Sequence, residues 1–141
     1  MSNSVVGFLF ILLFLPFTQT IDEDYLTGTW EVVSVENEPT EPPFNLMVSS
    51  FKDAKFYLNQ DRSTRIVSDT ETRWFKYLKD SLIDRSTWSL ENTEKKKTLV
   101  FSYKYIVTKI GVEKKDKDIL FNIFQERGEE QTMVLKMRKE N

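Results

Sequence analysis

The chain has 141 residues, with 20 Lys and Arg against 22 Asp and Glu, and it contains neither histidine nor cysteine. The lack of cysteine excludes disulfides, thiol nucleophiles and thiolate metal sites, and the lack of histidine excludes an imidazole base and imidazole zinc ligands. A net charge of −2 gives no electrostatic reason to expect a nucleic-acid partner. The length suits one domain, because domains typically run to about 100–150 residues.

The start of the chain differs in character from the rest. Residues 1–21 contain no charged side chain, and the stretch 5–17 is apolar throughout. This stretch is too short to cross a bilayer as a helix, which needs about 20 residues. Because polar and then acidic residues follow it, we predict a secretory signal peptide over 1–20 and one secreted or periplasmic domain over 21–141. The alternative is an uncleaved N-terminal anchor, which would then be the contact with a membrane.

Alternation of apolar and polar residues dominates the rest of the chain and predicts short β-strands. The predicted strands cover residues 29–36, 44–51, 55–59, 87–90, 98–105, 106–112, 119–125 and 131–138. We expect the second and third of them to pair as a hairpin. Prolines in the segment 36–43 forbid helix and central strand there. The charged residues 113–118 predict a solvated hairpin loop, and Gly128 predicts a tight turn at 127–129.

The segment 72–83 carries two conflicting patterns. Trp74, Leu78 and Leu82 have the spacing of a helical stripe, whereas Phe75 and Tyr77 alternate as in a strand. Because aromatic residues favour strands, we expect a strand here. The total of eight to ten short strands with compact, charged turns predicts an all-β antiparallel sandwich or barrel rather than β-α-β units.

The segment 26–35, Leu-Thr-Gly-Thr-Trp-Glu-Val-Val-Ser-Val, opens the first predicted strand. Its Gly28-x-Trp30 pattern resembles the signature of the lipocalin-like proteins of the calycin superfamily. More closely, it resembles small bacterial lipocalin-like domains that begin Leu-x-Gly-Thr-Trp just behind a signal sequence. Other segments resemble later strands of that group in the same order, namely 86–90 with 97–101, 118–121 and 132–138.

This resemblance implies an antiparallel up-and-down β-barrel. It also implies that Trp30 closes one end of the barrel and packs beneath a basic side chain from near the C-terminus, in a cation–π contact. Lys136 or Arg138 would supply that side chain, and we expect Arg138 because its planar guanidinium stacks well. Gly28 would let the chain enter the first strand tightly.

Bulky apolar side chains share one face of the predicted strands. These are Phe56, Leu58, Trp88, Leu90, Leu99, Phe101, Tyr103, Phe121, Ile123, Met133 and Leu135. The interior of an eight-stranded barrel is just wide enough for side chains or for one small ligand. We therefore predict an exported binding protein for a small hydrophobic molecule, held in or at the mouth of the barrel by these residues.

The alternative is a cell-envelope protein-interaction module with a filled core. Such a module would use the proline-rich loop 37–43 or the aromatic segment 72–83 as its surface. We expect no enzyme activity, metal or cofactor. The adjacent Ser49 and Ser50 have no histidine to activate them, and no cluster of carboxylates has the spacing of an EF-hand loop.

Overall fold

The computed structural model describes residues 20–124 and 131–141, and in these ranges the chain forms eight antiparallel strands. They are β1 (Gly28–Asn37), β2 (Lys55–Leu58), β3 (Thr64–Val67), β4 (Thr87–Asn92), β5 (Lys97–Tyr103), β6 (Ile106–Lys115), β7 (Asp118–Phe124) and β8 (Gln131–Lys139). Between them lie α2 (Glu23–Leu26), the 3-10 helix η1 (Phe44–Met47), α3 (Val48–Lys52), α4 (Arg73–Leu78) and the π-helix η2 (Lys79–Ile83).

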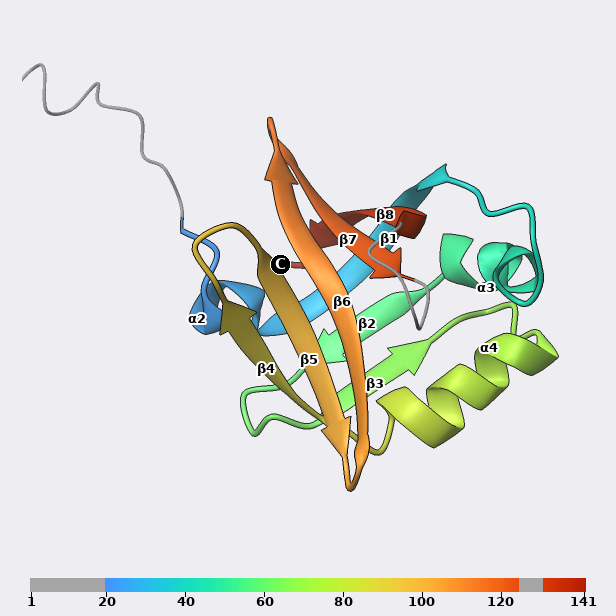
Figure 1. The fold of residues 1–141 in the computed structure, drawn as a ribbon, viewed down its shortest axis with the longest axis horizontal. Helices are drawn as coiled ribbons and strands as arrows, with labels where there is room; N and C mark the ends of the chain where they lie inside the picture. Colours follow the sequence, from blue (N-terminus) through green and yellow to red (C-terminus); the bar gives the residue numbers. More distant parts are fainter. Residues whose placement is uncertain (1–19, 125–130) are drawn as a thin grey trace, which may run out of the picture.

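The strands form one sheet in the order β3-β2-β1-β8-β7-β6-β5-β4 (Figure 1). Strands that follow each other in the chain are neighbours, except β3 and β4, and β1 pairs with β8. The sheet is therefore a nearly closed, up-and-down, lipocalin-like barrel, as predicted from the sequence. Most predicted strands are confirmed. Residues 1–19 of the predicted signal peptide 1–20 and the predicted turn at 127–129 lie outside the described residues.

Alternation along each strand places one set of side chains inside the barrel. On β8, Met133, Leu135 and Met137 are buried, and they lie opposite Ile123, Phe121 and Ile119 of β7. The core is correspondingly aromatic, because five of its largest fully buried side chains are Trp30, Phe51, Phe56, Phe101 and Phe121. Burial of such side chains is worth about 1.5–3 kcal/mol each, so these rings are the main source of stability.

Two tight hairpins join β5 to β6 and β6 to β7, and the predicted strand over 98–105 ends at Tyr103. The β5–β6 turn uses Lys104 and Tyr105, with Lys104 at φ 54°, and the β6–β7 turn uses Asp116 and Lys117, with Asp116 at φ 56°. The prediction of a solvated loop over 113–118 is wrong except at its tip. Strand β6 continues to Lys115, because charged side chains that point into solvent are compatible with a strand.

Two predicted strands are helical. Residues 44–51 form η1 and α3, where Met47 and Phe51 are buried four residues apart on one side. The predicted hairpin is therefore wrong, and β2 pairs instead with β1 and with β3, a four-residue strand that the sequence pattern did not indicate. Residues 72–83 form α4 and η2, which bury Phe75 and Ile83 against the barrel. None of the helices in the described ranges is long and apolar enough to cross a membrane.

Short helices cover both ends of the barrel. At one end, Leu26 of α2 is fully buried and its carbonyl accepts a 2.8 Å hydrogen bond from Trp30 Nε1. At the other end, the Phe51 ring of α3 packs against Phe56 of β2 and Phe75 of α4, with centroid distances of 6.4 and 5.4 Å. Figure 1 shows α2 on the opposite side of the barrel from α3 and α4.

The seam between β3 and β4 is closed by side chains rather than by a continuous ladder. A single bridge joins Ser63 to Thr87. Beside it, the buried Thr64 hydroxyl lies 2.5 Å from the Ile83 carbonyl and 2.8 Å from Ser86 Oγ. Residues at the end of η2 thus occupy the place where a β3–β4 ladder would otherwise lie.

Candidate functional site

The structure brings the predicted ligand-lining residues together on the inner face of the barrel. Eight of them are buried, namely Phe56, Leu58, Trp88, Leu99, Phe101, Phe121, Met133 and Leu135. The remaining three, Leu90, Tyr103 and Ile123, are half-buried. Alternation in the sequence therefore identified the inner face correctly, but it did not indicate whether that face surrounds a space.

The rings inside the barrel contact one another. Phe121 of β7 lies 5.6 Å from the ring of Phe56 on β2 and 5.9 Å from the ring of Trp30 on β1, measured between centroids. These distances are within the range of aromatic packing, so no lipid chain fits between the rings as they stand. The interior around Phe121 is filled by the protein's own side chains.

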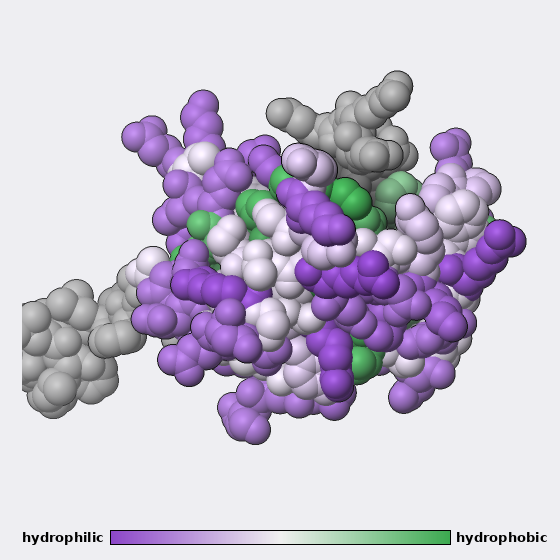
Figure 2. Space-filling model, turned by 90° about the horizontal axis from the view of Figure 1, so that it is seen from below, coloured by the Kyte–Doolittle hydropathy of each residue, from purple (hydrophilic) through white to green (hydrophobic). Residues whose placement is uncertain are grey.

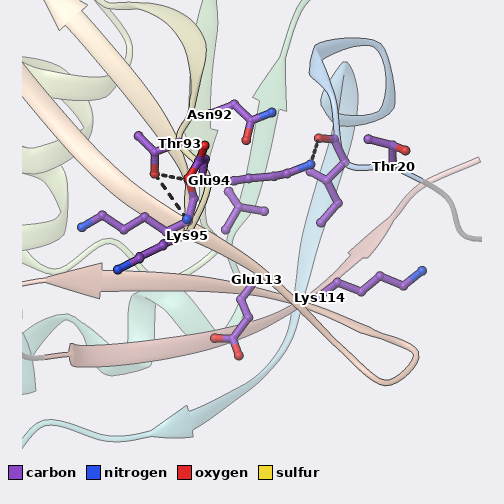
Figure 3. A pocket seen from close by; sticks show the side chains of 11 residues that line it. Thr20, Asn92, Thr93, Glu94, Lys95, Glu113 and Lys114 are labelled. Carbon is purple, nitrogen blue, oxygen red and sulfur yellow. Dashed lines mark hydrogen bonds between the residues drawn. The ribbon is translucent and has the colours of Figure 1, made fainter.

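The clearest hollows in the described residues lie outside the barrel, at the β4–β5 turn. One hollow of about 500 Å³ lies beside residues 92–97, 112–114 and 20–21, and a second of about 670 Å³ borders residues 93–96 alone. None of the predicted ligand-lining residues borders either of them. Figure 3 shows that Glu113 and Lys114 extend in different directions instead of converging on one point. These open hollows have no arrangement of groups that would hold a particular ligand.

The Gly28-x-Trp30 pattern lies at the end of the barrel that α2 covers. Trp30 is 1% exposed, and its ring packs edge-on against Tyr25, 5.7 Å between centroids. The basic group over this tryptophan is Lys139, whose Nζ lies 6.0 Å from the Trp30 ring and donates a 2.7 Å hydrogen bond to the Tyr25 carbonyl. These contacts stabilise the end of the barrel that α2 covers.

The prediction that Arg138 packs on Trp30 is wrong, and so is the alternative of Lys136. Met137 points inward, so both neighbours point outward in a strand. Arg138 is exposed and forms an ion pair with Glu31 on β1, with Nε 2.6 Å from Oε1. Lys139 lies two residues after Met137 and therefore shares its inward face of the strand. This alternation is the sequence signal that could have identified Lys139.

Three polar side chains fasten the segment that precedes β1. Lys97 Nζ of β5 donates a 2.5 Å hydrogen bond to the Ile21 carbonyl, and Glu23 accepts a 3.2 Å hydrogen bond from the Leu90 amide of β4. Glu23 also pairs with Arg62 of the β2–β3 turn. Because these partners lie on different parts of the barrel, the segment 21–26 is held firmly across the end of the barrel that α2 covers.

Five exposed apolar side chains lie on α4 and at the tip of the β5–β6 hairpin. Trp74 and Tyr77 of α4 are 45% and 61% exposed, and in the β5–β6 hairpin Tyr105, Ile106 and Val107 are 100%, 45% and 54% exposed. We call these five residues the aromatic surface. Helix η2, which continues α4, packs against β5, and Figure 1 shows α4 and the hairpin tip along the same lower side of the barrel.

Cationic residues flank the aromatic surface. Arg73, Lys76, Arg85 and Lys104 are exposed around it, whereas the acidic Asp80 is exposed on η2. Lys79 and Asp84 lie 2.5 Å apart and neutralise each other. A hydrogen bond and the positive charge from Lys104, together with Arg85, lower the pKa of the Tyr103 phenol. This end is therefore positive, although the chain as a whole carries −2.

Comparison with known proteins adds no relative. The chain matches no known protein family, no curated protein and no solved structure. In the ranges 20–124 and 131–141, no group of three or more acidic side chains is placed to bind a metal ion. The class of protein is thus given by strand order and register alone, as an eight-stranded lipocalin-like barrel.

Proposed function

We propose that the protein is a binding domain that acts through its outer surface, with a barrel core filled by its own side chains. The supporting observation is the contact of Phe121 with rings from two other strands, Phe56 and Trp30, at 5.6 and 5.9 Å. Ligand pockets usually enclose about 300–1,000 Å³. A ligand of that size would have to displace these rings, whereas the aromatic surface is already accessible.

A fatty-acid fluorophore tests the filled core. We expect no fluorescence enhancement with the purified protein, and no co-purified lipid in native mass spectra. A benzene-sized apolar probe is tested in parallel, with the Phe121→Ala variant as its positive control, because an engineered apolar cavity stays dry and binds small apolar molecules. Saturable binding of the fluorophore to the unaltered protein, at one molecule per chain, would contradict the proposal.

The second candidate function is carriage of a small hydrophobic molecule inside the barrel. It is favoured by the seam between β3 and β4, where one bridge, Ser63 to Thr87, is the only backbone ladder contact among the described residues. Opening of this seam would give access to the inner face. A Ser63→Cys/Thr87→Cys variant tests this route, since directly opposed antiparallel residues have a spacing that a disulfide can span. Carriage predicts that oxidation blocks ligand uptake and that reduction restores it; the chain has no other cysteine to confuse the result.

We also propose that the chain is a distant, exported relative of the small bacterial lipocalin-like domains, without enzyme activity. Support comes from Gly28 and Trp30 at the start of β1 and from the basic Lys139 over the Trp30 ring. The apolar stretch 5–17 supports export. N-terminal sequencing of the protein recovered outside the cytoplasm tests export, and an intact Met1 would contradict cleavage.

A further inference from the structure

The β5–β6 hairpin ends in a projecting tip that no other part of residues 20–124 and 131–141 covers. Tyr105 is 100% exposed, and Ile106 and Val107 beside it are 45% and 54% exposed. Lys104 takes the positive-φ position of the turn and reaches the Tyr103 ring, with Nζ 5.3 Å from the centroid. Tyr105 is thus fully open to solvent, while Ile106, which lies opposite Tyr103 in the β5–β6 ladder, and Val107 are about half exposed.

Helix α4 adds a second element of the same composition. Trp74 and Tyr77 lie three residues apart, on one side of the helix, and are 45% and 61% exposed. Arg73 and Lys76 stand beside them on the exposed part of the helix. The two elements together present rings, short aliphatic groups and cations, which is the combination found where proteins meet the membrane–water interface.

The charge at this end has the sign that an anionic surface attracts. Segments 73–85 and 103–107 contain five cationic residues and two acidic residues, an excess of three positive charges in a chain of net charge −2. Asp69 and Glu71 lie in the loop before α4, and the excess is one positive charge when they are counted. Basic residues near a membrane surface each contribute roughly 1 kcal/mol of attraction to anionic lipid, so the cationic residues at this end favour contact with such a surface.

The distribution of apolar area argues for shallow contact. Figure 2 views the molecule from below Figure 1 and shows strongly hydrophobic residues only in small areas separated by hydrophilic side chains. A broad apolar face would suit a permanent protein interface, whereas isolated rings on a convex tip suit the headgroup layer of a bilayer. We propose that the aromatic surface docks on anionic phospholipid, with Tyr105 and Trp74 in the headgroup layer and Lys104 on a phosphate. This inference rests on the proposed function, because it names the partner of that outer surface.

Binding to vesicles tests the inference. The chain is mixed with phosphatidylcholine vesicles with and without phosphatidylglycerol, and bound protein is measured by sedimentation and tryptophan emission. Trp30 and Trp88 are 1% and 2% exposed, so a blue shift on binding reports Trp74. We expect binding that needs phosphatidylglycerol, weakens in salt, and falls about tenfold or more in the Lys104→Glu variant.

The control is the same change at the opposite end of β6. Lys117 occupies the tip of the β6–β7 hairpin, and Lys117→Glu should leave vesicle binding unchanged. Comparing the two variants cancels any contribution of residues 1–19, which are common to both. A second variant, Tyr105→Ser, should lower binding without altering the melting temperature, because the side chain is fully exposed. Absence of vesicle binding, or equal loss in Lys104→Glu and Lys117→Glu, would overturn the membrane inference. It would leave the filled-core proposal intact, since the fluorophore experiment decides that separately.

Discussion

The Lys139 ammonium lies 6.0 Å from the centroid of the Trp30 ring while donating a hydrogen bond to the Tyr25 carbonyl. One side chain from the last strand thus holds both the first strand and the helix that covers the end of the barrel. Because β1 and β8 are paired neighbours in the sheet, this contact reinforces their junction at the end of the barrel that α2 covers.

We expect Lys139→Met to lower the free energy of unfolding by about 1–3 kcal/mol, because the cation–π contact and a charged hydrogen bond are lost while the apolar stem is kept. Urea denaturation followed by tryptophan fluorescence measures the change. Arg138→Met is the matched control on the same strand. Its ion pair with Glu31 is exposed, so we expect a loss below about 1 kcal/mol. An equal loss in both variants would contradict the role of Lys139.

Gly28 makes room for that lysine. Its φ of 137° is unfavourable for other residues, and a Cβ at this position would lie 3.0 Å from Lys139 Cε. We expect Gly28→Ala to cost about 1–3 kcal/mol of unfolding free energy. Because part of this cost is the close approach, Gly28→Ala and Lys139→Ala should be less than additive in a double-mutant cycle. Strict additivity would show that backbone strain alone accounts for the glycine.

Replacing Trp30 should damage the fold rather than one particular function. The ring contacts Tyr25 and Phe121, and its Nε1 donates to the Leu26 carbonyl. We expect Trp30→Ala to lower the free energy of unfolding by about 3–5 kcal/mol, as for other buried aromatic residues. Melting measured by circular dichroism checks this, with Trp74→Ala as the control, because Trp74 is 45% exposed. Unchanged melting of Trp30→Ala would refute its role at the end of the barrel.

Much of the fold could be predicted from the sequence because period-two alternation directly reflects which side of a strand faces the core. Alternation failed where a segment packs end-on against the barrel. Phe75 and Tyr77 are spaced like residues on one face of a strand. In α4, however, residues two apart point to opposite sides, so Phe75 is buried and Tyr77 is exposed. Strand propensity was overridden there by tertiary packing.

The candidate surfaces were predictable to different degrees. The inner-face residues followed from alternation, but their packing depends on rings that meet across the barrel, such as Phe56 and Phe121, which no local pattern encodes. Ile106 and Val107 look like core residues in the sequence. They are exposed because the turn at Lys104 and Tyr105 carries the hairpin tip away from the core.

The β2–β3 turn provides a test at acidic pH. Asp61 accepts hydrogen bonds from the side chain of Ser63 at 2.5 Å and from its backbone amide at 2.9 Å, and these hydrogen bonds lower the pKa of Asp61 below its usual value of 3.8. A carboxylate with a lowered pKa in the folded state stabilises the fold above its unfolded pKa, and this contribution is lost as pH falls through the folded pKa. Ser63→Ala removes the hydrogen bond from the hydroxyl, which lowers the pKa most, and keeps the hydrogen bond from the backbone amide. The pKa of Asp61 should therefore rise toward the usual value without reaching it. Carboxyl carbon shifts in an NMR titration measure this pKa directly, with Asp53→Asn to confirm the assignment of neighbouring acidic signals. An Asp61 pKa that is the same in both proteins would show that the Ser63 hydroxyl does not hold the carboxylate in solution.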